Sequence, residues 1–487
     1  MTTEHQYKVV IIGTGFGGIA AALRLKAAGI DDFRLLERRA FLGGTWAQNH
    51  YPGAAVDVQS PLYSLSSEPN DWTEMFAKQS ELRAYTANII EKHRLVEHCI
   101  VSCEVKSLQW LGSQQRWQIN TTQGDFKAQF VINASGPLSQ AKFPHLPGLE
   151  QFKGRCLHTN QWDDAVDLTG KRVAIIGTGA SAAQLIPAVV DQVKSLDVFQ
   201  RTPHWVMPRP DYVFKPWQRR LLKYALLQKL LRTVIYLGLE SRFIAFKYLP
   251  LMLKLYAEPT ARRLLKRQIK SPSLRDAVTP DYTIGCKRII LSNTYLAALD
   301  QPQVCLHSKD DPIVRITPTG AVTHTGREIE LDVLICATGY QATDGLIPYE
   351  IVGEGGQSLT ETWADYPRAY LGTTVPNFPN FFLLSGPNSG VGHTSAVFII
   401  ESQLNYVLDC FRQVDGAGMQ SIVVRAEREA EYTARIHKMM TKTVWHWGGC
   451  QSWYQSASGK VIAMFPAFST TFWRWTRRAK LHDHQLR

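Results

Sequence analysis

Two apolar runs of the chain each enter a turn of small residues and are followed by a helical pattern. The runs are YKVVII from Tyr7 and RVAII from Arg172, and the turns are GTGFGG and GTGASA. A second apolar run follows each helical pattern: FRLLE ends at Glu37 and SLDVFQR ends at Arg201. Strand, tight turn, helix and strand in this order predict two βαβ units with parallel strands.

Both turns have the spacing of dinucleotide-binding loops. The first glycine of such a loop permits a tight turn, the second lets the backbone approach a pyrophosphate, and the third lets the helix pack against the strand. The positions are Gly13, Gly15 and Gly18 in the first loop and Gly177, Gly179 and Ala182 in the second. We therefore predict an α/β fold with two Rossmann-like domains.

The residues that close the two second strands have opposite charges. Glu37 and Arg201 each lie 24 residues after the first glycine of their loop. A carboxylate accepts hydrogen bonds from a ribose diol, whereas an arginine bonds a ribose 2′-phosphate in a bidentate manner. The first loop is thus predicted to bind FAD and the second NADPH, with a solvated strand-end arginine as the alternative for Arg201.

Further segments favour a flavin. Gly44, Thr45 and Trp46 follow shortly after Glu37. The run 330–340 reads as a buried strand, and the run 381–393 reads as a strand feeding a turn that can reach a flavin. No C-x-x-x-x-C motif follows the first loop, which argues against a disulfide reductase.

The composition indicates an ordinary globular protein, with 45% apolar and 20% charged residues. Eight cysteines occur without a C-x-x-C pair, which predicts scattered reduced thiols and neither a disulfide framework nor a zinc site. The first residues show no signal-peptide pattern, and we expect a cytoplasmic protein.

The net charge of +12 is concentrated in one segment. Residues 215–275 hold fifteen basic and two acidic residues, so the rest of the chain is nearly neutral. Residues 214–278 are predicted to form helices without a membrane span. A solvated basic face is the first interpretation, and weak peripheral contact with an anionic membrane, helped by Trp473 and Trp475, is the second. No motif suggests nucleic-acid binding.

The stretch FKGRCLHTNQWDD between the two loops carries Phe152, Gly154, His158, Trp162 and Asp163. We predict a linker and no core strand here, acting as a hinge between two domains. His158 and Trp162 are i, i+4 neighbours if this linker is helical. His158 is interpreted as a buried hydrogen-bonding residue and not as a catalytic base.

With the two loops, this stretch resembles the pattern of class B flavoprotein monooxygenases, and within them of the Baeyer–Villiger monooxygenases. The segment YPGAAVD resembles another family motif and implies a role for Asp57, although Ala55 stands where many members have arginine. The resemblance also implies that Tyr63 contacts the flavin. In GCKRIIL it implies that Arg288 is the active-site arginine and Lys287 a second ligand of the NADP phosphate. Val105 and Thr202 complete the predicted cofactor-binding set.

The resemblance implies a ketone-oxygenating enzyme that uses FAD, NADPH and O2. The expected product is an ester or lactone, formed through a C4a-peroxyflavin, with Arg288 as a permanent cation near the developing oxyanion and Asp57 positioning it. Oxygenation of sulfur or amines is one alternative. A non-catalytic flavoprotein of a transport assembly is another, which the phosphate-binding cations disfavour.

The predicted organisation has three parts. An FAD-binding domain begins in 1–150 and returns in 342–487 with the C-terminal tail. An NADP-binding domain occupies 151–341 and contains a helical insertion at about 214–278. We expect a monomer or a small homo-oligomer acting on a lipophilic small molecule.

Overall fold

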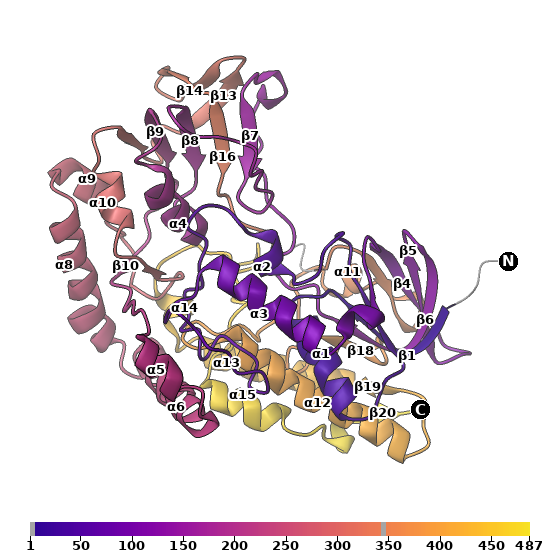
Figure 1. Ribbon diagram of the computed structural model, residues 1–487. Coiled ribbons are helices and arrows are strands. Elements are labelled where there is room, and N and C mark those ends of the chain that lie inside the picture. The colour runs from indigo at the N-terminus through magenta and orange to yellow at the C-terminus, as the bar shows by residue number, and fades with distance from the viewer. Residues whose placement is uncertain (1–4, 342–346) are drawn as a thin grey trace.

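The computed structural model describes residues 5–341 and 347–487 (Figure 1). The predicted start of the returning segment at residue 342 lies outside the described residues. Figure 1 shows one α/β body around β1, a second around β8, and an arc of helices that runs from the second body toward the first.

The first body is built on an eight-stranded sheet in which β1 lies between β6 and β2. Its order is β17-β4-β5-β6-β1-β2-β3, and β18 pairs in parallel with β6. The strands are β1 (His5–Ile12), β2 (Phe33–Leu36), β3 (Cys99–Ile100), β4 (Val105–Leu111), β5 (Arg116–Thr121), β6 (Gly124–Asn133), β17 (Glu350–Val352) and β18 (Phe381–Leu383). Thus residues 350–383 return to a sheet that the N-terminal segment began.

The centre of this sheet explains the apolar run of the sequence. Val9, Val10 and Ile11 are fully buried because β1 is covered on both faces, as a central parallel strand requires. One face carries α1 (Phe16–Ala27) and α12 (Ala396–Gly416) in a shared core. β1 therefore ends in the middle of the sheet, where the first glycine turn begins.

The second body is a parallel five-stranded sheet in the order β12-β9-β8-β16-β7. Its strands are β7 (Arg155–His158), β8 (Arg172–Ile176), β9 (Ser195–Phe199), β12 (Val304–His307) and β16 (Val333–Cys336). The helices α4 (Ala180–Val189) and α10 (Tyr295–Leu299) pack on it, and a small antiparallel sheet adjoins it. That sheet contains β13 (Ile313–Thr317), β14 (Gly320–Thr323) and β15 (Glu328–Glu330).

The prediction of a linker between the two domains needs one correction, because part of the stretch forms an edge strand of the second sheet. Arg155–His158 form β7, which pairs with β16 at the edge of the sheet. His158 ends this strand, so it is not a helical neighbour of Trp162. The polar appearance of the stretch reflects an edge strand, of which only Leu157 and His158 are buried.

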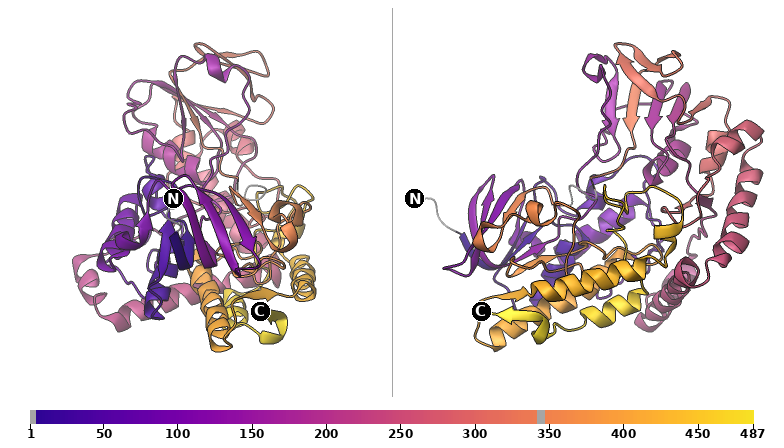
Figure 2. Two further views of the ribbon diagram at one scale, coloured as in Figure 1. Left: turned by 90° about the vertical axis from the view of Figure 1, so that its right-hand side faces the viewer. Right: turned by 180° about the vertical axis from the view of Figure 1, so that it is seen from behind.

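The helical insertion forms the outer arc in Figures 1 and 2. It comprises α5 (Pro216–Leu221), α6 (Ala225–Ser241), α7 (Phe243–Lys247), a π-helix (Leu253–Ala257), α8 (Glu258–Gln268) and α9 (Pro272–Ala277). The short strands β10 (Val206–Met207) and β11 (Ile290–Leu291) pair at its base. Among the described residues no helix combines the length and apolarity needed to cross a bilayer.

The remaining elements complete the first body, as the reverse view in Figure 2 shows for the C-terminal helices. They are α2 (Thr45–Gln48), α3 (Gln79–Lys92), α11 (Leu359–Thr362), α13 (Ala426–Met440), α14 (Val444–Trp447), α15 (Ser469–Thr476), and the paired strands β19 (Ile422–Val424) and β20 (His484–Leu486). The predicted α/β class with two Rossmann-like sheets is confirmed.

The prediction of eight reduced thiols is wrong for two of them. Cys286 and Cys450 form a disulfide with a Cα–Cα distance of 6.1 Å, and the other six cysteines are free. The partners are 164 residues apart in the sequence. The spacing of the cysteines in the sequence does not predict this pair, because the tertiary fold brings the two loops together.

Candidate active site

A cavity of about 330 Å³ opens where β1, β2 and β6 end, at the carboxyl edge of the eight-stranded sheet. Ligands bind at this edge in open α/β sheets. Its walls come from residues 12–17, 36–39, 44–45, 48, 103–105 and 134–139, from Tyr63, Arg288, Pro348, Tyr349 and Pro367, and from residues within 385–400 and 453–464. Gly13, Gly15, Glu37, Gly44, Thr45, Tyr63 and Val105 of the predicted site lie on this wall.

The glycines of the first loop create a place for a pyrophosphate. Gly13 has φ +103°, and a Cβ there would lie 2.7 Å from the carbonyl oxygen of Ala134. A Cβ on Gly44 would lie 2.4 Å from the Cα of Gly15, so two backbone segments meet without side chains. No side chain caps the N-terminus of α1, and its first turn contains no acidic residue. The free N–H groups and the helix dipole suit a diphosphate.

Gly18 has a packing role. A Cβ at this position would lie 2.0 Å from the carbonyl oxygen of Gly13. The residue is buried in α1, away from the cavity wall. Glycine here lets the helix lie close to its own strand, as the loop pattern requires.

Glu37 is held in a fixed position at the end of β2. The residue is 4% exposed, and its Oε2 accepts hydrogen bonds from the amide (3.1 Å) and hydroxyl (2.7 Å) of Thr14. Its Oε1 accepts a third bond from the amide of Arg39 (3.0 Å). The turn therefore supplies donors that stabilise a buried carboxylate facing the cavity.

Two arginines on the same wall were missed by sequence reasoning. The guanidinium of Arg38 donates to the carbonyl oxygen of Ser139, and Arg39 approaches the same oxygen at 3.4 Å. They line the main cavity and an adjoining one of about 480 Å³. Their place directly after Glu37, at the end of β2, was the signal available in the sequence.

Trp46 packs against Tyr63, a residue of the cavity wall. Its indole Nε1 donates to the hydroxyl of Tyr63 at 3.3 Å, and the two rings meet edge to face. Tyr63 and Thr45 face the cavity, whereas Trp46 is buried outside it. Burial, as the largest cause, raises the pKa of Tyr63, so this hydroxyl remains a neutral donor.

Arg288 reaches the cavity wall from the second body and is paired with Asp57. Its Nε donates to Oδ2 of Asp57 at 2.7 Å, and its Nη2 donates to the same oxygen. The charge of Asp57 is the largest cause raising the pKa of Arg288, so the guanidinium is a permanent cation. Arg288 lines the cavity, and Asp57 lies behind it.

The second loop repeats the design with different packing. Gly177 has φ +109°, and a Cβ there would lie 2.5 Å from the carbonyl oxygen of Ala337. α4 begins after Gly179 without a side-chain cap and without an acidic residue in its first turn. Ala182 is fully buried, so a methyl group replaces the third glycine without loss of packing.

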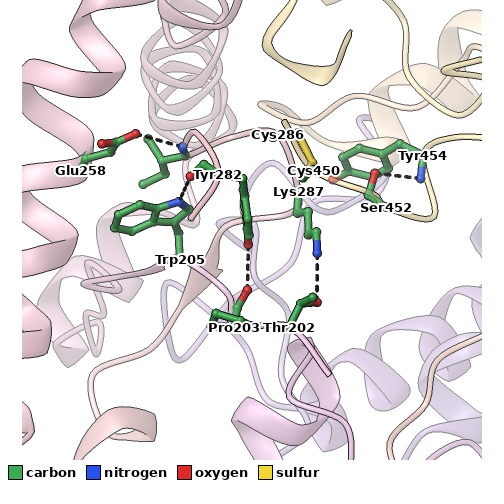
Figure 3. Close-up of a disulfide and its surroundings, with 11 residues drawn as sticks. Thr202, Pro203, Trp205, Glu258, Tyr282, Cys286, Lys287, Cys450, Ser452 and Tyr454 are labelled. Atoms are coloured by element: carbon green, nitrogen blue, oxygen red, sulfur yellow. Dashed lines mark hydrogen bonds between the residues drawn. A yellow bond between two sulfur atoms is a disulfide. The ribbon is translucent and has the colours of Figure 1, made fainter. Parts of the chain in front are cut away.

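Cations gather at the end of β9. Arg201 is exposed, and Nζ of Lys287 donates to the hydroxyl of Thr202 at 3.0 Å (Figure 3). Burial first, and then the charge of Arg201, lower the pKa of Lys287. Neighbouring His204 has its pKa lowered to about 4 by burial and by Lys287, so it is neutral at physiological pH. A phosphate dianion would relieve this repulsion between cations.

The linker residues are structural in this geometry. Gly154 fits because a Cβ there would lie 2.5 Å from the carbonyl oxygen of Asp332 and would also strike the ring of Phe152. His158 is 1% exposed, and its Nδ1 accepts from the amide of Asn160 at 3.0 Å. The pKa of His158 is lowered, and burial is the largest cause of this shift. Trp162 is buried in the core of the second body.

The linker also contacts the first body. The side chain of Gln48 donates to the carbonyl oxygen of Asn160, and Nδ2 of Asn160 donates to Oδ1 of Asn49 at 3.4 Å. Asp163 is exposed, and its Oδ1 accepts from the amide of Ala165 at 3.0 Å. The stretch therefore lies at the junction of the two bodies.

The fold and the site define an oxidoreductase with two dinucleotide-binding folds. The family model "Pyridine nucleotide-disulphide oxidoreductase" matches residues 10–237. A Baeyer–Villiger monooxygenase of Pseudomonas aeruginosa is 43% identical over 483 residues, covering 98% of this chain and 91% of the relative. One of Streptomyces coelicolor is 41% identical, covering 99% and 93%.

Solved structures agree. An oxidized steroid monooxygenase bound to NADP superposes with a TM-score of 0.88 at 28% identity, covering 99% of both chains. Cyclohexanone monooxygenase from Rhodococcus sp. Phi1 bound to NADP+ gives 0.89 at 27%, covering 100% of both. The chain belongs to the Baeyer–Villiger monooxygenase family. The family and the enzyme class predicted from the sequence, a flavoprotein monooxygenase, are confirmed.

Proposed function

We propose that the protein is an FAD-containing, NADPH- and O2-dependent monooxygenase that converts lipophilic ketones to esters or lactones. The observation that carries the proposal is the Arg288–Asp57 pair on the wall of a cavity that begins at a dinucleotide loop. The similarity to enzymes named for cyclohexanone and steroid oxygenation supports ketones as the substrate class.

The residues of the first cavity fit FAD. The glycine approach at Gly15 and Gly44 leaves room for a diphosphate, Glu37 suits the adenosine ribose, and Val105 lies beside that end of the cavity. Bound FAD would take reducing equivalents from NADPH and activate O2 for transfer of one oxygen atom.

Arg288 is proposed to stabilise negative charge at the ketone oxygen and at the attacking oxygen. A preorganised cation next to a partly apolar cavity acts strongly because little water screens it. Asp57 holds the guanidinium by its Nε and Nη2 and leaves the remaining N–H groups for the reactants. Tyr63 lies near the pair as a neutral hydroxyl.

The second loop is proposed to hold NADPH. Gly177 and Gly179 suit its pyrophosphate, and Arg201, Lys287 and Thr202 suit its 2′-phosphate. We keep the division into an FAD domain (1–150 and 342–487) and an NADP domain (151–341) as part of the proposal. The linker fingerprint then lies at the junction, where it limits how the two domains move.

The test is aerobic NADPH consumption by the FAD-loaded protein with a panel of ketones, thioethers and amines, with products identified by mass. Ester or lactone formation at a rate matching NADPH consumption supports the proposal. Conversion of thioethers or amines alone supports the heteroatom alternative. If the protein neither oxidises NADPH nor has its flavin reduced under any condition, the result supports a non-catalytic role.

A second proposal concerns the outer face of the helical insertion, which we propose contacts an anionic membrane surface. Sixteen of the 27 large apolar side chains exposed among the described residues lie within 212–256. On α6 the exposed large apolar residues are Leu226 (77%), Leu230 (57%), Val234 (59%) and Leu237 (59%), which share one helix face.

The opposite face of α6 is fixed to the first body, which sets the orientation of this apolar stripe. Arg232 donates to the carbonyl oxygens of Pro61 (2.8 Å) and Ser64 (3.0 Å). Buried Glu240 accepts from the hydroxyl of Ser469 at 2.7 Å. Because the surrounding segment has a net charge of +13, two copies of this face repel each other, whereas anionic lipid attracts it. We therefore favour a lipid surface over self-association.

A further inference from the structure

The disulfide between Cys286 and Cys450 connects the two bodies beside the proposed active site (Figure 3). Cys286 directly precedes Lys287 and lies two residues before Arg288. Cys450 lies on the loop after α14, within the C-terminal part of the chain. The bond therefore joins the segment that carries both functional cations to a segment of the flavin-binding body.

The loop after Cys450 forms part of the cavity wall. Trp453 and Tyr454 both line the cavity, as Arg288 does. Tyr454 is 4% exposed. Burial is the largest cause of its shifted pKa and raises it to about 12, while the charge of Arg288 opposes the rise. Its carbonyl oxygen accepts from the amides of Ile462 (2.9 Å) and Ala463 (3.1 Å), which also face the cavity.

Within the described part of the chain, few other contacts hold the beginning of this loop. The amide of Thr283 donates to the carbonyl oxygen of Gly448 at 3.0 Å. A Cβ on Gly448 would lie 2.6 Å from the Cβ of Cys286, so glycine at this position lets the backbone lie against the side chain of Cys286. Trp453 is 44% exposed, so burial contributes little to holding it.

The two cysteines of the disulfide differ in exposure. Cys286 is 1% exposed, whereas Cys450 is partly exposed and lies between exposed Gly449 and Gln451. Thiol–disulfide exchange requires access to one sulfur only. A small dithiol can therefore attack Cys450 without prior unfolding of the core around Cys286.

We propose that the Cys286–Cys450 disulfide is a thiol-responsive positioning device for the cavity wall beside Arg288. When closed, it holds Trp453 and Tyr454 against the segment of Lys287 and Arg288. When open, the loop moves away, the ketone binds less tightly, and more NADPH is consumed with release of hydrogen peroxide. The proposal rests on the proposed ketone oxygenation for its kinetic consequence only.

The chemistry of the two directions balances. In opening, a thiolate of the dithiol attacks Sγ of Cys450 and Cys286 leaves as a thiolate. The second thiol of the reagent then displaces Cys450 and forms the reagent's own disulfide, while both cysteines take up protons. In closing, one cysteine thiolate attacks hydrogen peroxide and becomes a sulfenic acid, with loss of hydroxide. The other thiolate displaces the second hydroxide, so two thiols and one peroxide give one disulfide and two waters.

The first test needs no activity. Thiol titration of the denatured protein should find six thiols before treatment with dithiothreitol and eight after it, as six cysteines are free. Chymotrypsin should cleave at Trp453 or Tyr454 faster in the reduced protein. Eight thiols without reductant, or a cleavage rate that does not depend on reduction, would overturn the proposal.

The second test compares the kinetics of the FAD-loaded protein before and after reduction and removal of the reductant. The ketone KM should rise about fivefold or more, in the range of couplings between conformational states, with the KM for NADPH nearly unchanged. Reoxidation by hydrogen peroxide should restore the original KM, which a merely destabilised protein would not do. The double variant C286S/C450S should show the open-state values without reductant, and Cys156→Ser, which changes a free thiol, should respond like the wild type.

The outcomes separate the two proposals. An unchanged ketone KM in the reduced protein overturns the positioning role even if ketones are converted. Absence of ketone conversion in both redox states overturns the proposed function. The thiol count and the proteolysis still test whether the disulfide forms and holds the loop. If the double variant does not fold, the reduced wild type provides the same comparison.

Discussion

Asp57 and Arg288 lie 231 residues apart in the sequence and meet in an ion pair, with 2.7 Å between Oδ2 and Nε. The carboxylate comes from the first body and the guanidinium from the segment after the helical insertion. Their contact therefore depends on how the two bodies are placed. The ion pair also orients the guanidinium toward the cavity that the first glycine loop lines.

Replacing Arg288 by alanine should nearly abolish ester formation while FAD remains bound. The change leaves the first loop and Glu37 intact but removes the cation at the developing oxyanion. Loss of such a preorganised charge typically costs about 10²–10³ in rate, or roughly 2.7–4 kcal/mol. Oxygen consumption should then appear as hydrogen peroxide, measured with a peroxidase assay beside product quantification. Arg288→Lys should recover little activity, because an ammonium lacks the planar fork that Asp57 holds. Ester formation near the wild-type rate in Arg288→Ala would assign Arg288 a structural role.

Removing Arg201 should erode the preference for NADPH over NADH. The arginine is exposed at the end of β9, near the Lys287–Thr202 contact. We expect Arg201→Ala to raise the KM for NADPH and to change that for NADH little, because only NADPH carries the 2′-phosphate. Arg412→Ala removes an exposed arginine on α12 and serves as the charge-matched control. Unchanged discrimination between the two nucleotides would remove Arg201 from the site.

The affinity for NADPH should begin to fall at a lower alkaline pH than it would if Lys287 had the pKa of an ordinary lysine. Burial and Arg201 lower the pKa of Lys287, so its ammonium loses its proton at a pH below the usual value of 10.5. The charged form attracts the phosphate. Affinity is therefore highest below this pKa and falls as pH rises through it. The KM for NADPH, measured against pH in wild type and Lys287→Ala, should show a rise in the wild type that the variant lacks. Parallel profiles would mean that another group titrates.

A methyl group at Gly44 should prevent FAD binding. It would approach the Cα of Gly15 to 2.4 Å and force apart the two segments that receive the pyrophosphate. Gly170→Ala is a matched control, since φ is +67° there and +60° at Gly44 but nothing lies within 4 Å of the added Cβ. Both variants place a Cβ at a positive φ, and only Gly44→Ala adds the clash with Gly15, together with the unusual ψ of −132° at that position. The ratio of flavin absorbance to protein absorbance reports the result. Equal FAD content in both variants would contradict this geometry.

Charges on the outer face of α6 should abolish binding to anionic vesicles. The double variant L230E/V234E alters the apolar stripe, and Val96→Glu changes an equally exposed residue (60%) elsewhere. Wild type and V96E should co-sediment with phosphatidylglycerol vesicles at low salt and be released at higher salt, where screening acts beyond ~10 Å at 0.1 M. Protein that stays in the supernatant at low salt would contradict the proposal. A dimer in light scattering that the double variant loses would assign the face to self-association instead.

The local pattern of the chain determined the two βαβ units, their glycine turns, and the charges at Glu37 and Arg201. These features depend on residues within about 25 positions of one another, and backbone geometry links them directly. The helical insertion was predictable for the same reason, because proline and amphipathic spacing act within a single element. The likeness to the family then implied Arg288 and Asp57 as partners.

Only the tertiary structure decided which distant residues meet. The Asp57–Arg288 pair, the Cys286–Cys450 disulfide and the exposed stripe on α6 depend on the relative placement of the bodies and the insertion. The edge strand at Arg155–His158 was missed because its pairing with β16 joins segments about 180 residues apart. Such contacts are selected by burial and packing of the whole chain, which no local pattern contains.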